Sequence, residues 1–212
     1  NSSTPNPVTS PLYQRLSEYQ EQTDHKAWTS KVWRELIKPL DLTLENQMHL
    51  TPVDRLEIVV LMDNLADNLL ESSELVIRPP ISNNGWIHTT PLVAEHGLSL
   101  LITLFAGEKK QTVLLDAAWN GVGLANNMKR LGISPEAIET IVLSHGHIDH
   151  CGGLSWLLDQ ISHSVSVVAH PDAFIADRYL EWEGKFNLIA PDRQGVIDSG
   201  AQEIETKTPY IS

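Results

Sequence analysis

The stretch LSHGHIDHCGGL, residues 143–154, constrains the fold more than any other part of this chain. It sets three histidines and one aspartate within six residues, after the apolar run TIVL, and two glycines follow closely. Imidazole and carboxylate groups are costly to bury, because each needs a hydrogen-bond partner or a metal ion. We therefore expect a strand that ends in a metal site.

The spacing of these four side chains predicts how they bind metal. At the end of an extended strand His145 and His147 project to the same side and can bind one ion, and Gly146 leaves the path between them open. Asp149 and His150 are adjacent, so in a turning loop they diverge from the first pair and can reach a second ion. Zinc accepts imidazole and carboxylate ligands together, and iron or manganese accepts the same set. Two divalent ions are predicted, zinc first, with iron or manganese as alternatives.

The main domain is expected to begin at Arg55, where short apolar runs start to alternate with helical patterns. RLEIVVLMD predicts a buried strand, RPPISNNGW a loop, and GLSLLITLF with TVLLDA a hairpin. Helices are expected at 124–131, ending before Gly132, and at 154–161, with strands TIVLS and VSVVA between and after them. Strands that alternate with helices predict an α/β layered domain.

Three segments are expected along the chain. Residues 1–10 form a flexible lead-in, residues 11–54 a helical extension of two amphipathic helices, and residues 55–212 the main domain. The final EIETKTPYIS predicts a strand or linker broken off in mid-pattern. The main domain is therefore expected to be incomplete at its C-terminal end.

Composition narrows the class of protein. The formal net charge is -12 without a compensating Lys/Arg cluster, which disfavours nucleic acid and favours a small-molecule substrate. No apolar run approaches the roughly 20 residues that a membrane span needs. Cys151 is the only cysteine, so an internal disulfide is excluded and a cytoplasmic location is predicted.

His145, His147, Asp149 and His150, with the glycines after them, resemble the signature loop of the metallo-β-lactamase superfamily. The resemblance implies the N-terminal part of an αβ/βα sandwich, preceded here by the helical extension. It also implies that the two first histidines hold one metal, while the aspartate and the last histidine hold the other.

Sequence segments on both sides of this loop narrow the resemblance to one subgroup of the superfamily. Over about residues 56–180 the chain resembles the subgroup of 7,8-dihydropterin-6-methyl-4-(β-D-ribofuranosyl)aminobenzene 5'-phosphate synthase-like proteins. The segments that carry this resemblance are LMDN, AEHGLSLLI, VLSHGHIDHCGGL and AHPDAF. The name of that subgroup implies pterin chemistry.

The chain departs from the family in two ways. Asp116-Ala117-Ala118 stands where relatives commonly carry Asp-Thr-Gly, which puts the geometry of that loop in question. The resemblance also implies further ligands, a histidine, a bridging aspartate and a last histidine, from a second half that we do not expect within residues 1–212. We therefore expect a C-terminal segment or a separate chain that completes both the sandwich and the metal shell.

Further polar residues fall at predicted strand ends, where they could bind substrate or support the metal ligands: Asp63, Asn64, Glu95, His96, Asp116 and His170. Functional and structural interpretations are both open for the first four. Glu95 could hold a metal-site histidine or fix the loop before GLSLLI. For His170 three roles are open, as a ligand, a pocket residue or a structural histidine.

The sequence thus predicts a metal-dependent hydrolase that attacks a small ester, lactone or phosphoester with a metal-bound hydroxide. Asp149 is the predicted catalytic residue, which orients the hydroxide and passes on its proton. Two alternatives are a binding or regulatory protein with a degenerate metal site and a nucleic-acid phosphodiesterase.

Overall fold

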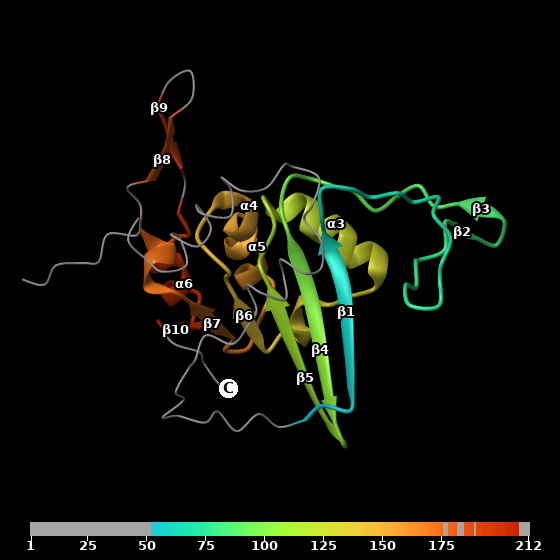
Figure 1. Ribbon diagram of the computed structural model, residues 1–212, viewed down its shortest axis with the longest axis horizontal. Coiled ribbons are helices and arrows are strands. Elements are labelled where there is room, and N and C mark those ends of the chain that lie inside the picture. Colours follow the sequence, from blue (N-terminus) through green and yellow to red (C-terminus); the bar gives the residue numbers. More distant parts are fainter. Residues whose placement is uncertain (1–51, 176–177, 182–184, 189, 208–212) are drawn as a thin grey trace, which may run out of the picture. The chain divides into compact units, whose positions relative to one another are not determined.

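The fold is seen in a computed structural model that describes residues 52–175, 178–181, 185–188 and 190–207 (Figure 1). The predicted lead-in and nearly all of the predicted helical extension lie outside the described residues. No helix among the described residues is both long enough and apolar enough to cross a membrane.

A six-stranded mixed sheet forms the frame, in the order β1-β4-β5-β6-β7-β10. The pairs β1/β4 and β4/β5 are antiparallel, while β5, β6, β7 and β10 run parallel. The strands are β1 (Arg55–Met62), β4 (Ser99–Ala106), β5 (Lys109–Leu115), β6 (Thr140–Val142), β7 (Ser166–Ala169) and β10 (Gln202–Glu205). Two small hairpins pair β2 (Ser82–Asn83) with β3 (Trp86–Ile87) and β8 (Arg178–Glu181) with β9 (Lys185–Leu188).

The connections explain the mixed sheet, since a tight turn can join antiparallel strands but parallel strands need a longer crossover. The helices are α3 (Gly121–Leu131), α4 (Ile148–Cys151), α5 (Leu154–Asp159) and α6 (Arg193–Asp198), with 3₁₀ turns at Pro135–Ala137 and Pro171–Phe174. The Asn120 side chain caps α3 by accepting hydrogen bonds from the N–H groups of Val122 and Gly123. Gly132, at φ 68°, ends α3 at the predicted residue.

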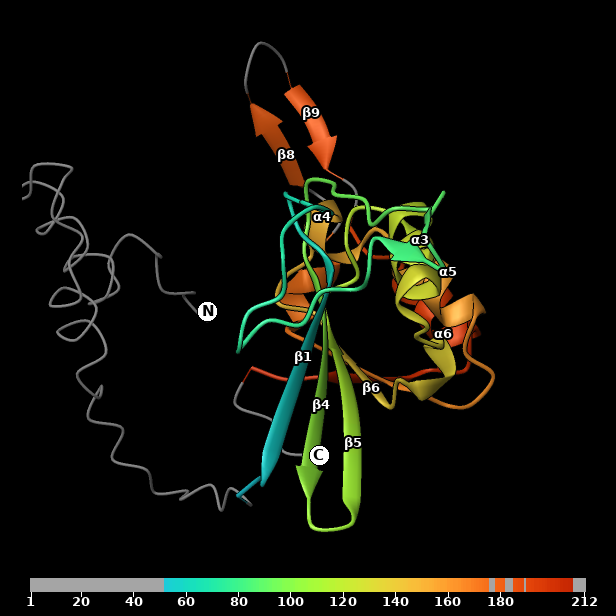
Figure 2. The same cartoon turned by 90° about the vertical axis from the view of Figure 1, so that its right-hand side faces the viewer.

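The core lies between one face of the sheet and the helices (Figure 2). Leu61, Leu101 and Leu114 point from the strands into this layer. From the helices come Leu124 and Met128 of α3, Leu154, Leu157 and Leu158 of α5, and Val196 of α6. The predicted buried stripe of the second helix is confirmed, because Ile161 and the leucines of α5 are all buried.

The opposite face of the sheet is aliphatic as well. Leu56, Ile58 and Val60 alternate with the inward residues of β1 and are 50%, 54% and 52% exposed. Cross-strand partners continue the same face on β4 and β5, and we call the set the outer face: Leu56, Ile58, Val60, Leu100, Ile102, Leu104, Val113 and Leu115. An aliphatic sheet face that is half exposed along one strand is unusual for a finished domain.

The structure confirms the α/β fold class, the first strand, the hairpin and the two helices. The prediction that the first strand is buried is wrong, because only Leu61 and Met62 of β1 are buried and one of its faces is half exposed. The loop predicted for RPPISNNGW is partly wrong, because it contains the β2–β3 hairpin around Asn84 and Gly85. Both residues have positive φ, 50° and 80°, as an Asn-Gly hairpin turn requires. The strand or linker predicted for EIETKTPYIS is in part a strand, because its first residues belong to β10 of the sheet.

Candidate metal centre

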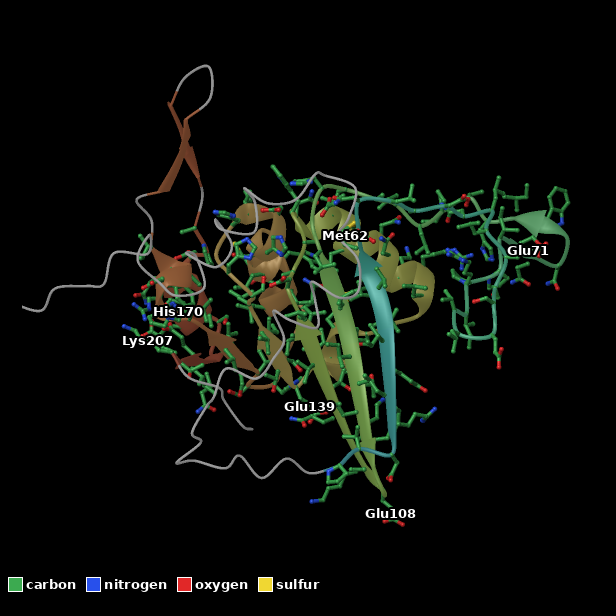
Figure 3. The ribbon with its side chains drawn as sticks, viewed as in Figure 1. Met62, Glu71, Glu108, Glu139, His170 and Lys207 are labelled. Carbon is green, nitrogen blue, oxygen red and sulfur yellow. The ribbon has the colours of Figure 1, made fainter. Side chains whose placement is uncertain are left out.

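The predicted site residues gather because several strands end at one edge of the sheet. The C-terminal ends of β1, β5 and β6 meet there, and so does the start of antiparallel β4. Met62, labelled in Figure 3, marks this end of β1. Asp116 follows β5 directly, and the histidine loop follows β6 after two residues.

Three of the predicted ligands form one compact donor group. The ligand atoms of His145, His147 and Asp149 all lie within 4.8 Å of one another. Nε2 of His145 is 3.1 Å from Nδ1 of His147, with ring centroids 4.7 Å apart. The single helical turn α4 begins after His147 and turns Asp149 back toward the pair. Asp149 therefore does not diverge from the first two histidines as predicted, and it lies close enough to serve either ion.

His150 adjoins this group but is fixed from the other side. Its ring centroid is 4.2 Å from that of His145, and its Nε2 is 3.3 Å from Oδ2 of Asp149. Its Nδ1 lies 2.8 Å from Oδ2 of Asp116. An ionised carboxylate can only accept, so Nδ1 carries the proton and Nε2 keeps the lone pair that a metal needs.

Asp116 is itself fully buried and held on both oxygens. Its Oδ1 accepts from the backbone N–H of Ser144 at 2.8 Å, and its Oδ2 accepts from the Ser144 hydroxyl at 2.7 Å. A buried carboxylate with these partners is fixed in orientation. Asp116 therefore fixes the orientation of His150, a predicted metal ligand, which agrees with one of the two roles that the sequence left open for it.

Electrostatics suit this group to cations. The pKa of His145 is lowered from its ordinary value, chiefly by burial and then by the nearby His150 and His147, while Asp116 and Asp149 oppose the shift. Burial disfavours the imidazolium, and a neutral imidazole keeps a lone pair for a metal. Imidazole nitrogens and a carboxylate within one ion's reach fit a divalent metal such as zinc.

Glu95 does not contact a histidine of the site. Its Oε1 accepts from the backbone N–H groups of Trp119 and Asn120, at 3.0 and 3.3 Å, and its Oε2 accepts from Asn120 Nδ2 at 2.9 Å. Glu95 therefore fixes the loop that follows β5. The sequence had offered a similar structural role for it, but at a different loop, the one before GLSLLI.

The other candidates before β4 position the segment that carries His96. Oδ1 of Asn64 accepts from the N–H of Gly97 at 3.2 Å, and the carbonyl of Asp63 accepts from the N–H of Glu95 at 3.3 Å. His96 itself lies next to the donor group, with its Nε2 3.5 Å from Oδ2 of Asp149.

His170 is outside the donor group of His145, His147 and Asp149. Its Nδ1 accepts from the N–H of Asp172 at 3.1 Å and so caps the 3₁₀ turn after β7. In Figure 3 it lies in the part of the fold that holds α6 and β10, directly after β7, the strand that pairs with β6. This contact is structural, and the roles of His170 as a ligand or a pocket residue stay predictions.

Close backbone approach explains the glycines of the motif. A Cβ on Gly152 would lie 1.9 Å from the carbonyl oxygen of Trp119. The N–H of Gly152 donates to the carbonyl of Ala118, and the N–H of Gly153 to that of Ala117, both at 3.0 Å. The loop after β5 therefore keeps its contacts although it carries two alanines. Keeping these contacts places Ala118 at φ 58°, a left-handed conformation that is strained for alanine and would be unstrained for glycine.

Two residues that sequence reasoning missed shape the site, Ser144 and Trp119. Ser144 was hidden because its partner Asp116 is 28 residues away. Trp119 had one available signal, its position three residues after the strand-end aspartate.

With this geometry established, comparison with known proteins identifies the family. The model of the metallo-beta-lactamase superfamily matches residues 94–209, more than half of the chain. The chain belongs to the metallo-beta-lactamase superfamily. The predicted resemblance and fold class are thereby confirmed.

Two curated relatives come from Methanocaldococcus jannaschii. One is named 7,8-dihydropterin-6-methyl-4-(beta-D-ribofuranosyl)-aminobenzene-5'-phosphate synthase and is 38% identical over 87 residues, 41% of this chain and 30% of the relative. The other, an uncharacterized protein, is 41% identical over 86 residues, 41% of this chain and 31% of the relative. The matched stretch thus spans less than a third of each relative.

Solved structures give a more distant likeness. A metallo-beta-lactamase of Cronobacter sakazakii with a HARLDQ motif is 20% identical, with TM-score 0.38 over 55% of this chain and 42% of that one. A diphosphatase from the PhnP family is 15% identical, with TM-score 0.38 over 74% of this chain and 54% of that one. The family assignment therefore rests on the sequence match.

Proposed function

We propose that this chain provides the metal-binding part of a hydrolase that cleaves a small ester, lactone or phosphoester. The donor group of His145, His147 and Asp149, with His150 held beside it by Asp116, carries the proposal. The superfamily includes hydrolases, and histidine and aspartate side chains at a strand end can bind the metal ions that such hydrolases use. The proposed ions are two zinc ions, with iron or manganese as alternatives.

Each side chain has a proposed part. Divalent ions bound here would lower the pKa of coordinated water and stabilise negative charge on the substrate. His145 and His147 hold the first ion, and Asp149 and His150 hold the second. Asp149 Oδ2 also accepts the proton of the attacking water, which is the catalytic step assigned to this chain.

Replacing Asp149 with alanine tests the proposal. Its carbonyl, which accepts from the N–H of Leu98, is retained, so the loop keeps its backbone anchor. Turnover of ester, lactone and phosphoester probes should fall by roughly 10²–10⁴-fold, with unchanged circular dichroism. Asp159→Ala, an exposed carboxylate at the end of α5, is the matched control and should keep full activity. Full activity in Asp149→Ala would refute the role.

Metal content separates the enzyme from its alternatives. About two ions per molecule support the hydrolase, whereas a well-folded sample that binds none supports a binding or regulatory protein. Strong, salt-dependent binding to nucleic acid would instead favour a phosphodiesterase acting on that polymer. One relative is named a synthase, so the synthase reaction should be assayed together with the ester, lactone and phosphoester probes.

We also propose that a C-terminal segment or a separate chain covers the outer face and supplies the remaining metal ligands. The half-exposed aliphatic side chains of β1 support this, and so does the matched stretch covering less than a third of each relative. Ile58→Lys should weaken the association, whereas Glu57→Lys, which lies on the other face of β1, should not. The masses of all polypeptides in a native sample would check whether such a segment or chain is present. A stable monomer of 23.6 kDa would contradict this proposal. We propose a cytoplasmic location for the protein.

A further inference from the structure

Two exposed aromatic rings lie beside the donor group. The rings of His96 and Trp119 have centroids 5.9 Å apart and an interplanar angle of 59°. The side chain of His96 is 72% exposed and Trp119 is 42% exposed. Neither ring contributes to the hydrophobic core, so core packing does not account for their position.

The backbone under both rings is nevertheless tightly held. The Glu95 carboxylate accepts from the N–H of Trp119, and the Trp119 carbonyl lies against Gly152, where a Cβ would not fit. His96 is followed by Gly97, whose N–H donates to Asn64 Oδ1 and whose own Cβ would lie 2.5 Å from the Asp149 carbonyl. Fixed backbone under exposed rings is the arrangement expected of a preorganised binding surface.

The pair also stands next to the proposed reaction. Nε2 of His96 is 3.5 Å from Oδ2 of Asp149, so a substrate at the donor group would extend past His96 and Trp119. Aromatic rings attract one another in offset-stacked or edge-to-face contacts at centroid distances of roughly 4.5–7 Å. Two tilted rings therefore form a corner that can contact the face and the edge of a third ring.

We propose that Trp119 and His96 form a subsite for a planar aromatic or heteroaromatic group of the substrate. The inference rests on the proposed function in one respect, since the bond to be cleaved would lie at the donor group. Trp119 supplies the larger stacking surface, and His96 orients the ring toward Asp149. Both are positioning residues and neither is assigned a step in catalysis.

Ligand binding tests the subsite without turnover. Phenylphosphonate and ethylphosphonate share an anionic head and differ in the planar ring. Titration calorimetry of the intact, metal-loaded protein should show phenylphosphonate binding roughly three- to tenfold more tightly than ethylphosphonate. Trp119→Ala should abolish this preference, and Trp119→Phe should retain most of it. Trp86→Ala removes another exposed tryptophan, on the β2–β3 hairpin, and should leave the preference unchanged.

The outcomes distinguish the two proposals. Equal affinity of the metal-loaded protein for both phosphonates would overturn the subsite and leave the proposed function standing. A ring preference that depends on Trp119 in a protein that binds no metal would support the subsite and overturn the proposed function. A fall in bound metal caused by His96→Ala would show that this histidine is a ligand and would overturn its assignment to the subsite.

Discussion

Nδ1 of His150 lies 2.8 Å from Oδ2 of Asp116, which joins the end of β5 to the loop after β6. The contact settles which nitrogen of His150 faces the donor group, because the buried carboxylate can only accept. Ser144 holds the same carboxylate through both its backbone N–H and its hydroxyl. The metal-facing geometry of His150 is thus set by a residue that is not itself in the donor group.

Asp116→Asn should therefore weaken metal binding. The amide nitrogen that replaces one carboxylate oxygen cannot accept a hydrogen bond, so either His150 or Ser144 loses its partner. Loss of such a supporting contact typically lowers metal affinity by roughly 10–100-fold. Competition against a fluorescent zinc chelator would measure the change.

Ser144→Ala is the comparison for that variant. It removes the hydroxyl, with its contacts to Asp116 Oδ2 and to Nδ1 of His145 at 2.9 Å, but keeps the backbone N–H bond and the His150 contact. The loss of affinity should therefore be smaller. Equal losses in both variants would mean that the hydroxyl, and not the contact with His150, controls the site.

Gly152→Ala should destabilise the fold although its backbone is unstrained, with φ -67°. The new methyl group would lie 1.9 Å from the Trp119 carbonyl oxygen, and backbone must move to admit it. Overpacking of this kind costs about 1–3 kcal/mol. Gly195→Ala is the matched control, because its new methyl would meet the side chain of Asp192 and a helix gains from alanine. Urea denaturation of both variants gives the two free energies of unfolding.

The sequence allowed the donor group to be predicted because its order is local. His145, His147 and Asp149 lie within five residues, and His150 follows them directly, so a strand end alone brings these side chains together. Its supports are not local, since Glu95 binds Trp119 across 24 residues and Asp116 binds His150 across 34. Polar contacts at such separations leave no periodic pattern, and the roles of those residues emerge only from the fold.

The fold itself divides in the same way. Short apolar runs were enough to predict β1 and the β4–β5 hairpin, whereas the β2–β3 hairpin has strands of only two residues. So short a run has no detectable period, and only the Asn-Gly pair at 84–85 indicated a turn. The outward side of β1 is as aliphatic as its inward side, so the sequence alone did not say which face the helices cover.

Asn127→Leu should destabilise the protein more than its position on a helix indicates. The Asn127 side chain is buried, and its Nδ2 donates to the carbonyls of Leu61 and Val93, at 2.7 and 2.8 Å. Its Oδ1 accepts from the N–H of Val93 at 2.9 Å. Leucine has the same number of side-chain heavy atoms and the same branching but leaves these buried backbone groups unpaired, at about 1–3 kcal/mol for each.

The neighbouring Asn126→Ala serves as its control. Asn126 donates to the carbonyl of Pro91 and to Asn127 Oδ1, at the surface of the same helix, so its loss should cost about 1 kcal/mol. Thermal unfolding of both variants at equal metal occupancy would compare them. A similar shift in both would show that the buried backbone groups find other partners.

Removal of metal should lower stability through the same donor group. A ligand that binds only the folded state stabilises it by about 2.7 kcal/mol when its concentration is roughly 100 times Kd. Chelator treatment should therefore lower Tm, and added zinc should restore it. His147→Ala removes a ligand of the donor group and should abolish the response to zinc, whereas His163→Ala, whose ring binds Glu136 and the Ile138 carbonyl, should preserve it. An unchanged zinc response in His147→Ala would place the bound ion elsewhere in the protein.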